Sequence, residues 1–411
     1  MCAYSEYPIS TGELVKVKSK EEFRKYLTCY ACIFDCEFEN IESKILFEHY
    51  LSVSKCNLQG EVIEDNGRLV YADKCETTIT NIDFEVIERC YKWSSFKIKN
   101  FRIYKKGYLP KDLILTILEL YAKKTTLKGV KGMEREYLNA KENVNSVYGM
   151  ACTSIVRNEF NYDNIDGWSQ SIPDIREKLN QYNTSFNRFL FYGFGLFVTA
   201  LARRNIWTAI YTTGKSNKYS KDCDYIYSDT DSCKITHHER YKEYFETYNQ
   251  MCVDNLKRMC KHYNIDFELC HPKTIEGKEK MLGVFDYEGT AQKFKTLGAK
   301  RYMTYKDGEL SYTIAGCGKK KGVPYLLNKF NGDIDKIFDY FDEDFTIPSD
   351  YTMKQTHTYI DEEYSAIVTD YEGVKCKVHE LSYIHLEPCE FTLSLSKTFK
   401  EFLATFRKDL Y

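Results

Sequence analysis

Hydrophobic and polar residues alternate in the first quarter of the chain. In residues 31–39 every second side chain is apolar, which is the period of a half-buried β-strand. Two more strand-like segments, residues 61–63 and 68–72, are separated by an Asp-Asn-Gly sequence, and Asn-Gly tolerates the positive φ of a tight hairpin turn. We therefore expect residues 26–105 to form a mixed, mostly antiparallel sheet with one helix near residues 82–93.

The apolar residues then change to helical spacing. They recur three or four positions apart up to about residue 125, after Pro110, which suits the first turn of a helix. Gly129 and Gly132 interrupt this pattern, and a second helix is expected over residues 134–148. The two segments predict a helical hairpin.

A polar stretch and a long apolar helix follow the helical hairpin. Residues 153–185 are polar and show no regular period, which predicts an irregular segment. A helix is expected from residue 186 to about 210, and a Gly/Ser/Lys loop connects it to a strand at residues 225–227. An antiparallel sheet with separate helices corresponds to an α+β fold.

The composition is typical of a globular chain. Of the 411 residues 43% are hydrophobic and 29% charged, enough to bury one large core or two to three smaller ones. No apolar run approaches the roughly 18 residues of a membrane span, and the first residues lack the basic and apolar regions of a signal peptide. We expect a cytoplasmic protein without a membrane segment.

The 16 cysteines are scattered without regular paired spacing, so we expect reduced thiols and no disulfides. Two groups of residues resemble zinc ligands in type. Cys29 and Cys32 would point to opposite faces of a strand, which does not suit a shared metal. The second group lacks two properly spaced ligand pairs and consists of Cys260, His262, Cys270 and His271. No structural zinc is expected.

Charge is segregated along the chain, although the formal net charge is only −2. Residues 291–330 contain nine basic and two acidic side chains, a local net charge of +7. Such a segment suits a nucleic-acid phosphate backbone. Residues 333–344 are acidic, and we interpret them as a solvated helix face and loop without a function.

The strongest candidate for chemistry is an acidic turn between two apolar strands. Asp229 and Asp231 are two positions apart, so both carboxylates can reach one pair of divalent metal ions while Thr230 faces away. Hard oxygen ligands favour Mg²⁺, and two Mg²⁺ ions can promote an in-line phosphoryl transfer. Alternatively, Ser-Asp-Thr-Asp-Ser is an exposed hairpin turn without a catalytic role.

Three motifs, in the expected order, resemble those of family B DNA polymerases. Tyr-Ser-Asp-Thr-Asp-Ser at residues 227–232 resembles the motif Tyr-x-Asp-Thr-Asp-Ser, whereas reverse transcriptases have two adjacent aspartates there. Residues 141–149 are similar to Lys-x-x-x-Asn-Ser-x-Tyr-Gly. Residues 300–302 are similar to the Lys-x-Tyr motif that holds the primer strand. The resemblance to protein-primed, phage-type enzymes covers nearly the whole chain.

The resemblance implies a polymerase right hand with a mixed antiparallel palm sheet, helical-hairpin fingers and a thumb. Residues 1–105 would be the N-terminal part of the palm, 106–150 the fingers and 151–310 the rest of the palm. A possible insertion at residues 153–185 occupies the place of the strand-displacement insertion of protein-primed relatives. Residues 311–411 would be the thumb and C-terminal region.

The resemblance also implies individual site residues. Asp229 and Asp231 would be catalytic and bind two Mg²⁺ ions. Lys141, Asn145 and Tyr148 lie at positions i, i+4 and i+7 and would form one nucleotide-binding face of a helix. Lys124 resembles a second fingers lysine, although its neighbour Lys123 is equally basic. The residues expected to bind DNA are Tyr227, Lys300, Arg301 and Tyr302. Primer-template DNA and dNTPs would be the partners, in phage or mobile-element DNA replication.

The motif with the family's other catalytic aspartate, Asp-x-x-Ser-x-Tyr-Pro, is incomplete. Residues 5–8 match its last four positions, but the aspartate position falls on Cys2, and a neutral thiol is a poor Mg²⁺ ligand. Asp35 lacks the Ser-x-Tyr-Pro context, and we expect the chain to lack the 3′ to 5′ exonuclease domain that the family normally has further upstream. We expect an N-terminal fragment to supply the missing aspartate. The alternative is a truncated nucleic-acid- and nucleotide-binding protein without catalytic activity.

Overall fold

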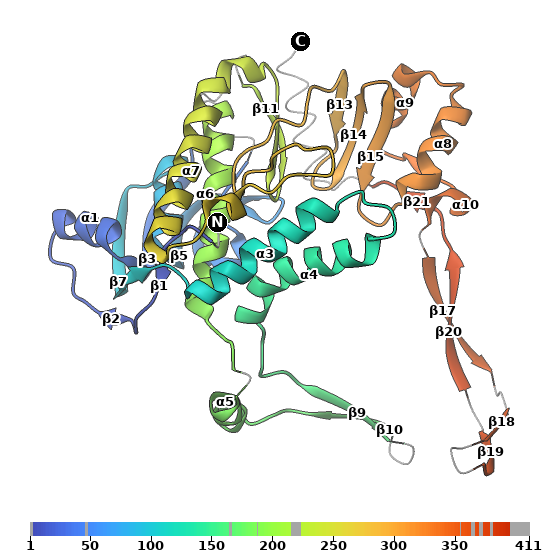
Figure 1. Ribbon diagram of the computed structural model, residues 1–411, viewed down its shortest axis with the longest axis horizontal. Coiled ribbons are helices and arrows are strands. Elements are labelled where there is room, and N and C mark those ends of the chain that lie inside the picture. Colours follow the sequence, from blue (N-terminus) through green and yellow to red (C-terminus); the bar gives the residue numbers. More distant parts are fainter. Residues whose placement is uncertain are drawn as a thin grey trace. The chain divides into compact units, whose positions relative to one another are not determined.

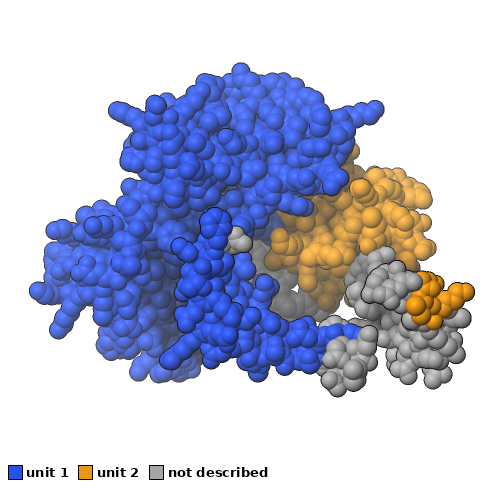
Figure 2. Space-filling model, turned by 60° about the horizontal axis from the view of Figure 1, so that its bottom comes forward, with its two compact units in different colours: residues 1–286 blue, residues 287–411 orange. Residues whose placement is uncertain are grey.

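The chain divides into two compact units, residues 1–286 and residues 287–411 (Figure 2). The computed structural model describes residues 3–45, 48–163, 167–186, 188–214, 223–353, 355–362, 366–369, 373–378 and 381–394. The expected boundary after residue 310 falls inside strand β15 (Glu309–Ile314), and the division into palm, fingers and thumb stays a prediction. The second unit instead begins before the three-stranded sheet to which β15 belongs.

A six-stranded antiparallel sheet forms a large part of the first unit (Figure 1). The strand order is β2-β7-β3-β5-β4, and β6 pairs with the end of β3. Asn66 and Gly67 have φ of 46° and 73° in the turn between β4 and β5, as the Asn-Gly pair predicts. The strands are β2 (Glu13–Leu14), β3 (Ala31–Ser43), β4 (Asn57–Asp65), β5 (Arg68–Thr80), β6 (Tyr91–Lys92) and β7 (Ser95–Tyr104). The sheet expected over residues 26–105 is therefore present.

Two helices accompany the sheet. Helix α2 (Asn81–Cys90) begins with a capping box between Thr80 and Asp83. It ends earlier than the expected residue 93 because the chain enters β6, which pairs with β3. Helix α1 (Lys20–Cys29) was not expected from the sequence; Ser19 caps it, and it buries only Phe23.

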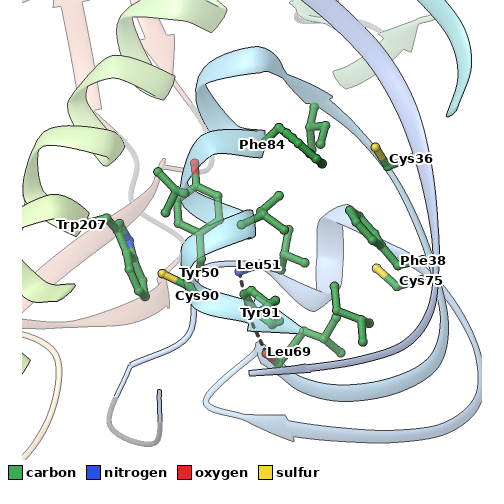
Figure 3. Packing of buried hydrophobic residues seen from close by; sticks show 14 of the residues in the cluster. Cys36, Phe38, Tyr50, Leu51, Leu69, Cys75, Phe84, Cys90, Tyr91 and Trp207 are labelled. Atoms are coloured by element: carbon green, nitrogen blue, oxygen red, sulfur yellow. Dashed lines mark hydrogen bonds between the residues drawn. The ribbon is translucent and has the colours of Figure 1, made fainter. Parts of the chain in front are cut away.

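The first hydrophobic core lies between the sheet, α2 and helix α6 (Tyr192–Gly214). Phe38 of β3, Phe84 of α2 and Trp207 of α6 are buried in it (Figure 3). The Tyr91 hydroxyl donates to the Leu69 carbonyl at 2.7 Å, so this buried polar group is satisfied. The core thus joins residues that lie more than a hundred positions apart in the sequence.

The expected helical hairpin is formed by α3 (Lys111–Leu127) and α4 (Glu134–Ala151), which lie side by side (Figure 1). Helix α3 buries Ile114 and Leu118 in a second core of the first unit, together with Phe197 of α6. Other parts of that core come from α7 (Lys242–Tyr263), the 3-10 helix η3 (Phe267–Cys270) and β1 (Tyr7–Pro8), which pairs with β8 (Lys106–Gly107). Helix α6 spans both cores.

The prediction of an irregular segment at residues 153–185 is wrong. It contains an antiparallel hairpin of β9 (Glu159–Asp163) and β10 (Gly167–Ser171), followed by α5 (Ile175–Thr184). No described residue of this hairpin or of α5 is buried, which explains the weak sequence period. Phe186 is 98% exposed, and the long helix begins at Tyr192 instead of residue 186.

The second unit contains the sheet β13-β14-β15, whose apolar face packs with the helices α8 and α9. The elements are β13 (Lys293–Thr296), β14 (Arg301–Lys306), β15, α8 (Lys319–Lys329), α9 (Ile334–Tyr340) and α10 (Ser349–Thr352). Three antiparallel pairs follow: β16 (Thr346–Ile347) with β21 (Phe391–Thr392), β17 (Gln355–Glu362) with β20 (Leu381–Pro388), and β18 (Ala366–Thr369) with β19 (Lys375–Val378).

Among the helices in the described part of the chain, none combines the length and the apolar character needed to cross a bilayer. In the described part of the chain, 14 cysteines are reduced thiols. Two cysteines of the second group that was compared with zinc ligands, Cys260 and Cys270, lie in the second core with their sulfurs 3.6 Å apart. Burial raises the pKa of both thiols, as expected of inert core residues.

Candidate active site

The acidic turn joins β11 (Tyr225–Asp229) to β12 (Ser232–Ile235), so the expected strand, turn and strand are present. Asp229 pairs with Ser232, which leaves Thr230 and Asp231 as a two-residue turn. The Asp231 N–H donates to the Asp229 carbonyl at 2.6 Å. Asp229 is half-buried and Asp231 is exposed, so the hairpin presents the second carboxylate to solvent.

The backbone of this turn is unusual because Thr230 has φ of 53°. A β-branched residue in this left-handed region costs roughly 1–3 kcal/mol and is uncommon in ordinary turns, which prefer Gly, Asn or Asp there. Such strain concentrates at functional sites, where neighbouring structure enforces it. The strained Thr230 therefore favours a functional turn over the alternative of a simple exposed turn.

The opposite end of the same hairpin is held by one buried carboxylate. Asp224 is 3% exposed and accepts hydrogen bonds from four side chains. Burial alone would raise its pKa, but the donors outweigh burial and hold the pKa of Asp224 well below its usual value. The donors are Thr236, His237, Tyr241 and Arg240, at 2.7, 2.7, 2.8 and 3.2 Å. Sequence reasoning missed this residue.

The metal donors of the hairpin have the right chemistry for Mg²⁺, but they are few. Within residues 3–394, apart from the gaps given above, no group of three or more His, Cys, Asp and Glu side chains could hold a metal ion. Cys2, where the motif requires an aspartate, lies outside the described residues. Two carboxylates leave most positions of an octahedral ion unfilled, so Asp229 and Asp231 fit only part of a two-metal site.

Asp35, the other candidate carboxylate, is engaged elsewhere. It lies on β3 between Phe34 and Cys36, which are buried in the core that also contains Tyr225. Because side chains alternate along a strand, Asp35 lies on the opposite face. Its carboxylate accepts hydrogen bonds from Thr78 at 2.6 Å and from an asparagine side chain at 2.7 Å. This placement argues against a role at the hairpin.

The predicted nucleotide-binding residues lie on the helical hairpin. Lys141, Asn145 and Tyr148 are exposed on α4, and their binding of a nucleotide stays a prediction. Lys124 is half-buried on the neighbouring α3 and Lys123 is exposed, which leaves the choice between the two lysines open. The structure thus places these side chains on one pair of packed helices.

The C-terminal end of α4 packs closely against α6. Burial raises the pKa of Tyr148, and the neighbouring Cys152 thiol adds to this effect. A Cβ atom at Gly195 of α6 would lie 1.7 Å from the Cys152 sulfur and 3.6 Å from the Tyr148 ring. Glycine at this position therefore permits the close approach of the two helices. The sequence motif around Tyr148 gave no sign of this contact.

The predicted DNA-binding residues are divided between the two units. Tyr227 of β11 is 8% exposed, so little of its side chain is accessible. In the second unit, Tyr302 stacks on Phe294 with ring centroids 5.5 Å apart, and Arg301 donates to a carbonyl of the chain's C-terminal part at 2.8 Å. Lys300 has φ of 55° and precedes β14, so it is not part of the strand that carries Tyr302.

Comparison with known proteins gives structural matches only. No protein-family model and no curated protein sequence matches the chain. Phi29 DNA polymerase complexed with single-stranded DNA is similar, with a TM-score of 0.53 and 16% identity over 95% of this chain and 55% of that chain. The chain has a DNA-polymerase-like fold. A phi29 DNA polymerase complex with primer-template DNA has a TM-score of 0.52 and 17% identity, over 95% of this chain and 55% of that chain. The ternary complex of phi29 DNA polymerase with primer-template DNA and incoming nucleotides has a TM-score of 0.51 and 16% identity, over 96% of this chain and 55% of that chain. This polymerase-like chain thus spans about half the length of its structural neighbours.

Proposed function

We propose that the chain is the DNA-synthesising part of a template-directed, family B DNA polymerase of the protein-primed type. One observation carries the proposal: the strained hairpin turn with Asp229 and Asp231 occurs on a polymerase-like fold. The turn alone could be structural and the fold alone does not define a reaction. Their combination supports nucleotidyl transfer from dNTPs to a primer 3′-hydroxyl.

Asp229 and Asp231 would hold Mg²⁺ together with a further carboxylate. When bound, two Mg²⁺ ions supply an activated attacking hydroxyl and stabilise the leaving oxygen. Asp229 is half-buried, while the exposed Asp231 carboxylate would be accessible to a metal ion from solvent. The third carboxylate stays a prediction from the Ser-x-Tyr-Pro motif, as does the N-terminal fragment that would provide it.

Lys141, Asn145 and Tyr148 would receive the incoming nucleotide. A lysine ammonium forms charge-assisted hydrogen bonds with phosphate oxygens, and an exposed tyrosine ring can pack against a base pair. Lys300, Arg301 and Tyr302 would bind the primer strand, since their segment carries the local net charge of +7. The proposed palm, fingers and thumb follow from these assignments, with the thumb region in the second unit.

Primer extension with the full chain tests the proposal. The chain is assayed as it is and with Cys2→Asp, which restores a carboxylate at the motif position. In the background that synthesises DNA, Asp231→Asn should lower the rate at least ~100-fold, because it removes a metal-binding charge. DNA affinity, measured by fluorescence anisotropy, should change less than about twofold.

Asp339→Asn serves as the matched control, because Asp339 is an exposed aspartate in the acidic run without an assigned function. It should leave rate and affinity unchanged. Near-normal synthesis by Asp231→Asn would overturn the metal assignment. DNA binding without synthesis in both backgrounds would favour the alternative of a nucleic-acid-binding protein without catalytic activity.

A further inference from the structure

The buried Asp224 carboxylate has no part in the proposed chemistry, yet it is among the most heavily hydrogen-bonded groups of the acidic hairpin. It lies five residues before Asp229, and a strand rises about 3.3 Å per residue, so the two carboxylates are separated by roughly 16 Å. Asp224 is therefore too far from the turn to share a metal ion with Asp229. Its role has to be argued from what it connects.

The backbone of Asp224 links the hairpin to the end of α6. Its N–H donates to the Thr213 carbonyl at 3.1 Å, and its own carbonyl accepts from the Thr236 N–H at 2.8 Å. Thr236 follows β12, so the second bond joins both ends of the hairpin. Thr213 is fully buried in the last turn of the helix that crosses both cores.

The side chain of Asp224 repeats these links with charged and hydroxyl groups. One carboxylate oxygen accepts from Thr236 and from His237, and the other accepts from Arg240 and Tyr241. The Tyr241 hydroxyl also lies 3.3 Å from the Thr213 carbonyl. One carboxylate thus ties the start of β11 and the end of β12 to the segment that leads into α7.

An amide could not replace this carboxylate without loss. Four donors require two acceptor oxygens, and an asparagine has one acceptor and a donating amide group. The amide nitrogen would face a donor on one side of the site, and the charge that pairs with Arg240 would be gone. The geometry therefore depends on an ionised aspartate.

We propose that Asp224 is a positioning residue for the active site: it fixes the base of the acidic hairpin so that the turn keeps Asp229 and Asp231 in place. This inference rests on the proposed function for its catalytic consequence only. A turn with a left-handed Thr230 is held in its conformation by neighbouring structure, and a hairpin anchored at its base supplies that constraint.

The alternative is that Asp224 contributes only to the stability of the fold. Asp83 offers a matched control, because it is 5% exposed and accepts hydrogen bonds from Thr80, Tyr50 and Arg203. It belongs to the same unit but lies at the start of α2, away from the hairpin. Asp83→Asn removes a comparable buried network without touching β11 or β12.

Hydrogen exchange on the full chain distinguishes the two roles. With Asp224→Asn, exchange in residues 225–235 should accelerate at least about tenfold, and more than in the remaining sheet. With Asp83→Asn, acceleration should centre on α2 and leave the hairpin unchanged. Equal acceleration throughout the unit for both variants, or an unchanged hairpin in Asp224→Asn, would overturn the proposal.

Kinetics provide the second readout. In the active background Asp224→Asn should lower kcat at least about tenfold, with KM for dNTP and DNA affinity within about twofold. The Mg²⁺ concentration for half-maximal rate should rise in this variant and stay constant in Asp83→Asn, which a loss of stability alone does not produce. If Asp224→Asn does not fold, Tyr241→Phe removes a single donor and should show the same exchange pattern in a weaker form. Absence of synthesis in every background refutes the proposed function, and the exchange data still decide the anchoring.

Discussion

The contact between α4 and α6 allows a substitution whose sign can be worked out from the structure. Gly195 is buried inside α6, and a methyl group there would lie 1.7 Å from the Cys152 sulfur. The Cys152 Cβ and the Tyr148 ring would be 3.5 and 3.6 Å away, which is ordinary contact. The steric conflict of Gly195→Ala is therefore confined to one sulfur atom.

Two effects oppose each other in this variant. Alanine in a helix interior is more favourable than glycine by about 1 kcal/mol. Forcing an extra methyl group into a packed site costs about 1–3 kcal/mol. Because 1.7 Å is far inside contact distance, the steric cost should dominate, and Gly195→Ala should destabilise the first unit by up to about 2 kcal/mol. The Cys152 side chain has to move to relieve the clash, and it interacts with Tyr148. A resulting loss of about 1 kcal/mol in nucleotide binding through Tyr148 should raise KM for dNTP roughly fivefold.

Removing the sulfur should reverse the sign. In a Cys152→Ala background the same Gly195→Ala change keeps the gain in helix propensity and loses the clash, so it should stabilise by up to about 1 kcal/mol. Urea unfolding followed by tryptophan fluorescence suits this test, since Trp93, Trp168 and Trp207 all lie in the first unit. Additive effects in the four-variant cycle would refute the reasoning.

Three other predictions concern the site. Lys141→Ala should raise KM for dNTP more than the DNA dissociation constant, and Lys300→Ala should do the reverse. Steady-state kinetics and fluorescence anisotropy measure the two quantities. The same pattern of changes in both variants would contradict the assignment. Cys2→Asp should increase synthesis in primer extension, whereas Asp35→Asn should leave it unchanged. The pKa of Asp224 is lowered in the folded protein, so the stability that its charge contributes is complete above the pKa of an unfolded aspartate, about 4, and is lost as pH falls below it. The difference in unfolding free energy between the natural chain and Asp224→Asn, measured by urea titration, should therefore shrink below about pH 4.

Local periodicity and turn chemistry predicted much of the first unit. The β4–β5 hairpin, α2 and the α3–α4 hairpin form where the apolar pattern and the turn residues place them. β5, α2 and α3 bury apolar side chains, whereas β4 and α4 stay mostly exposed. The strand-turn-strand of Asp229 and Asp231 was predicted for the same reason. Apolar residues precede and follow the turn, and the turn residues are polar.

The failures of sequence reasoning have a different physical origin. Residues 159–184 form two strands and a helix that bury almost nothing, so no apolar period marks them. Lys300 adopts a left-handed conformation between two strands, which a three-residue motif does not encode. Asp224 and Gly195 act through partners that are distant in sequence or in another helix, and such contacts leave no local pattern.

Several residues that motif comparison found are exposed, whereas the two that it missed are buried. Lys141, Tyr148 and Asp231 are accessible side chains whose types follow from the ligands that they would bind. Asp224 and Gly195 are buried, and their types follow from how two elements meet: four donors around one carboxylate, and a sulfur atom against a helix. An exposed side chain keeps the geometry for binding only if buried contacts hold its helix or strand in place. Substitutions in the buried support should therefore change catalytic rates without contacting substrate, and the variant pairs proposed for Asp224 and Gly195 measure this effect separately from global stability.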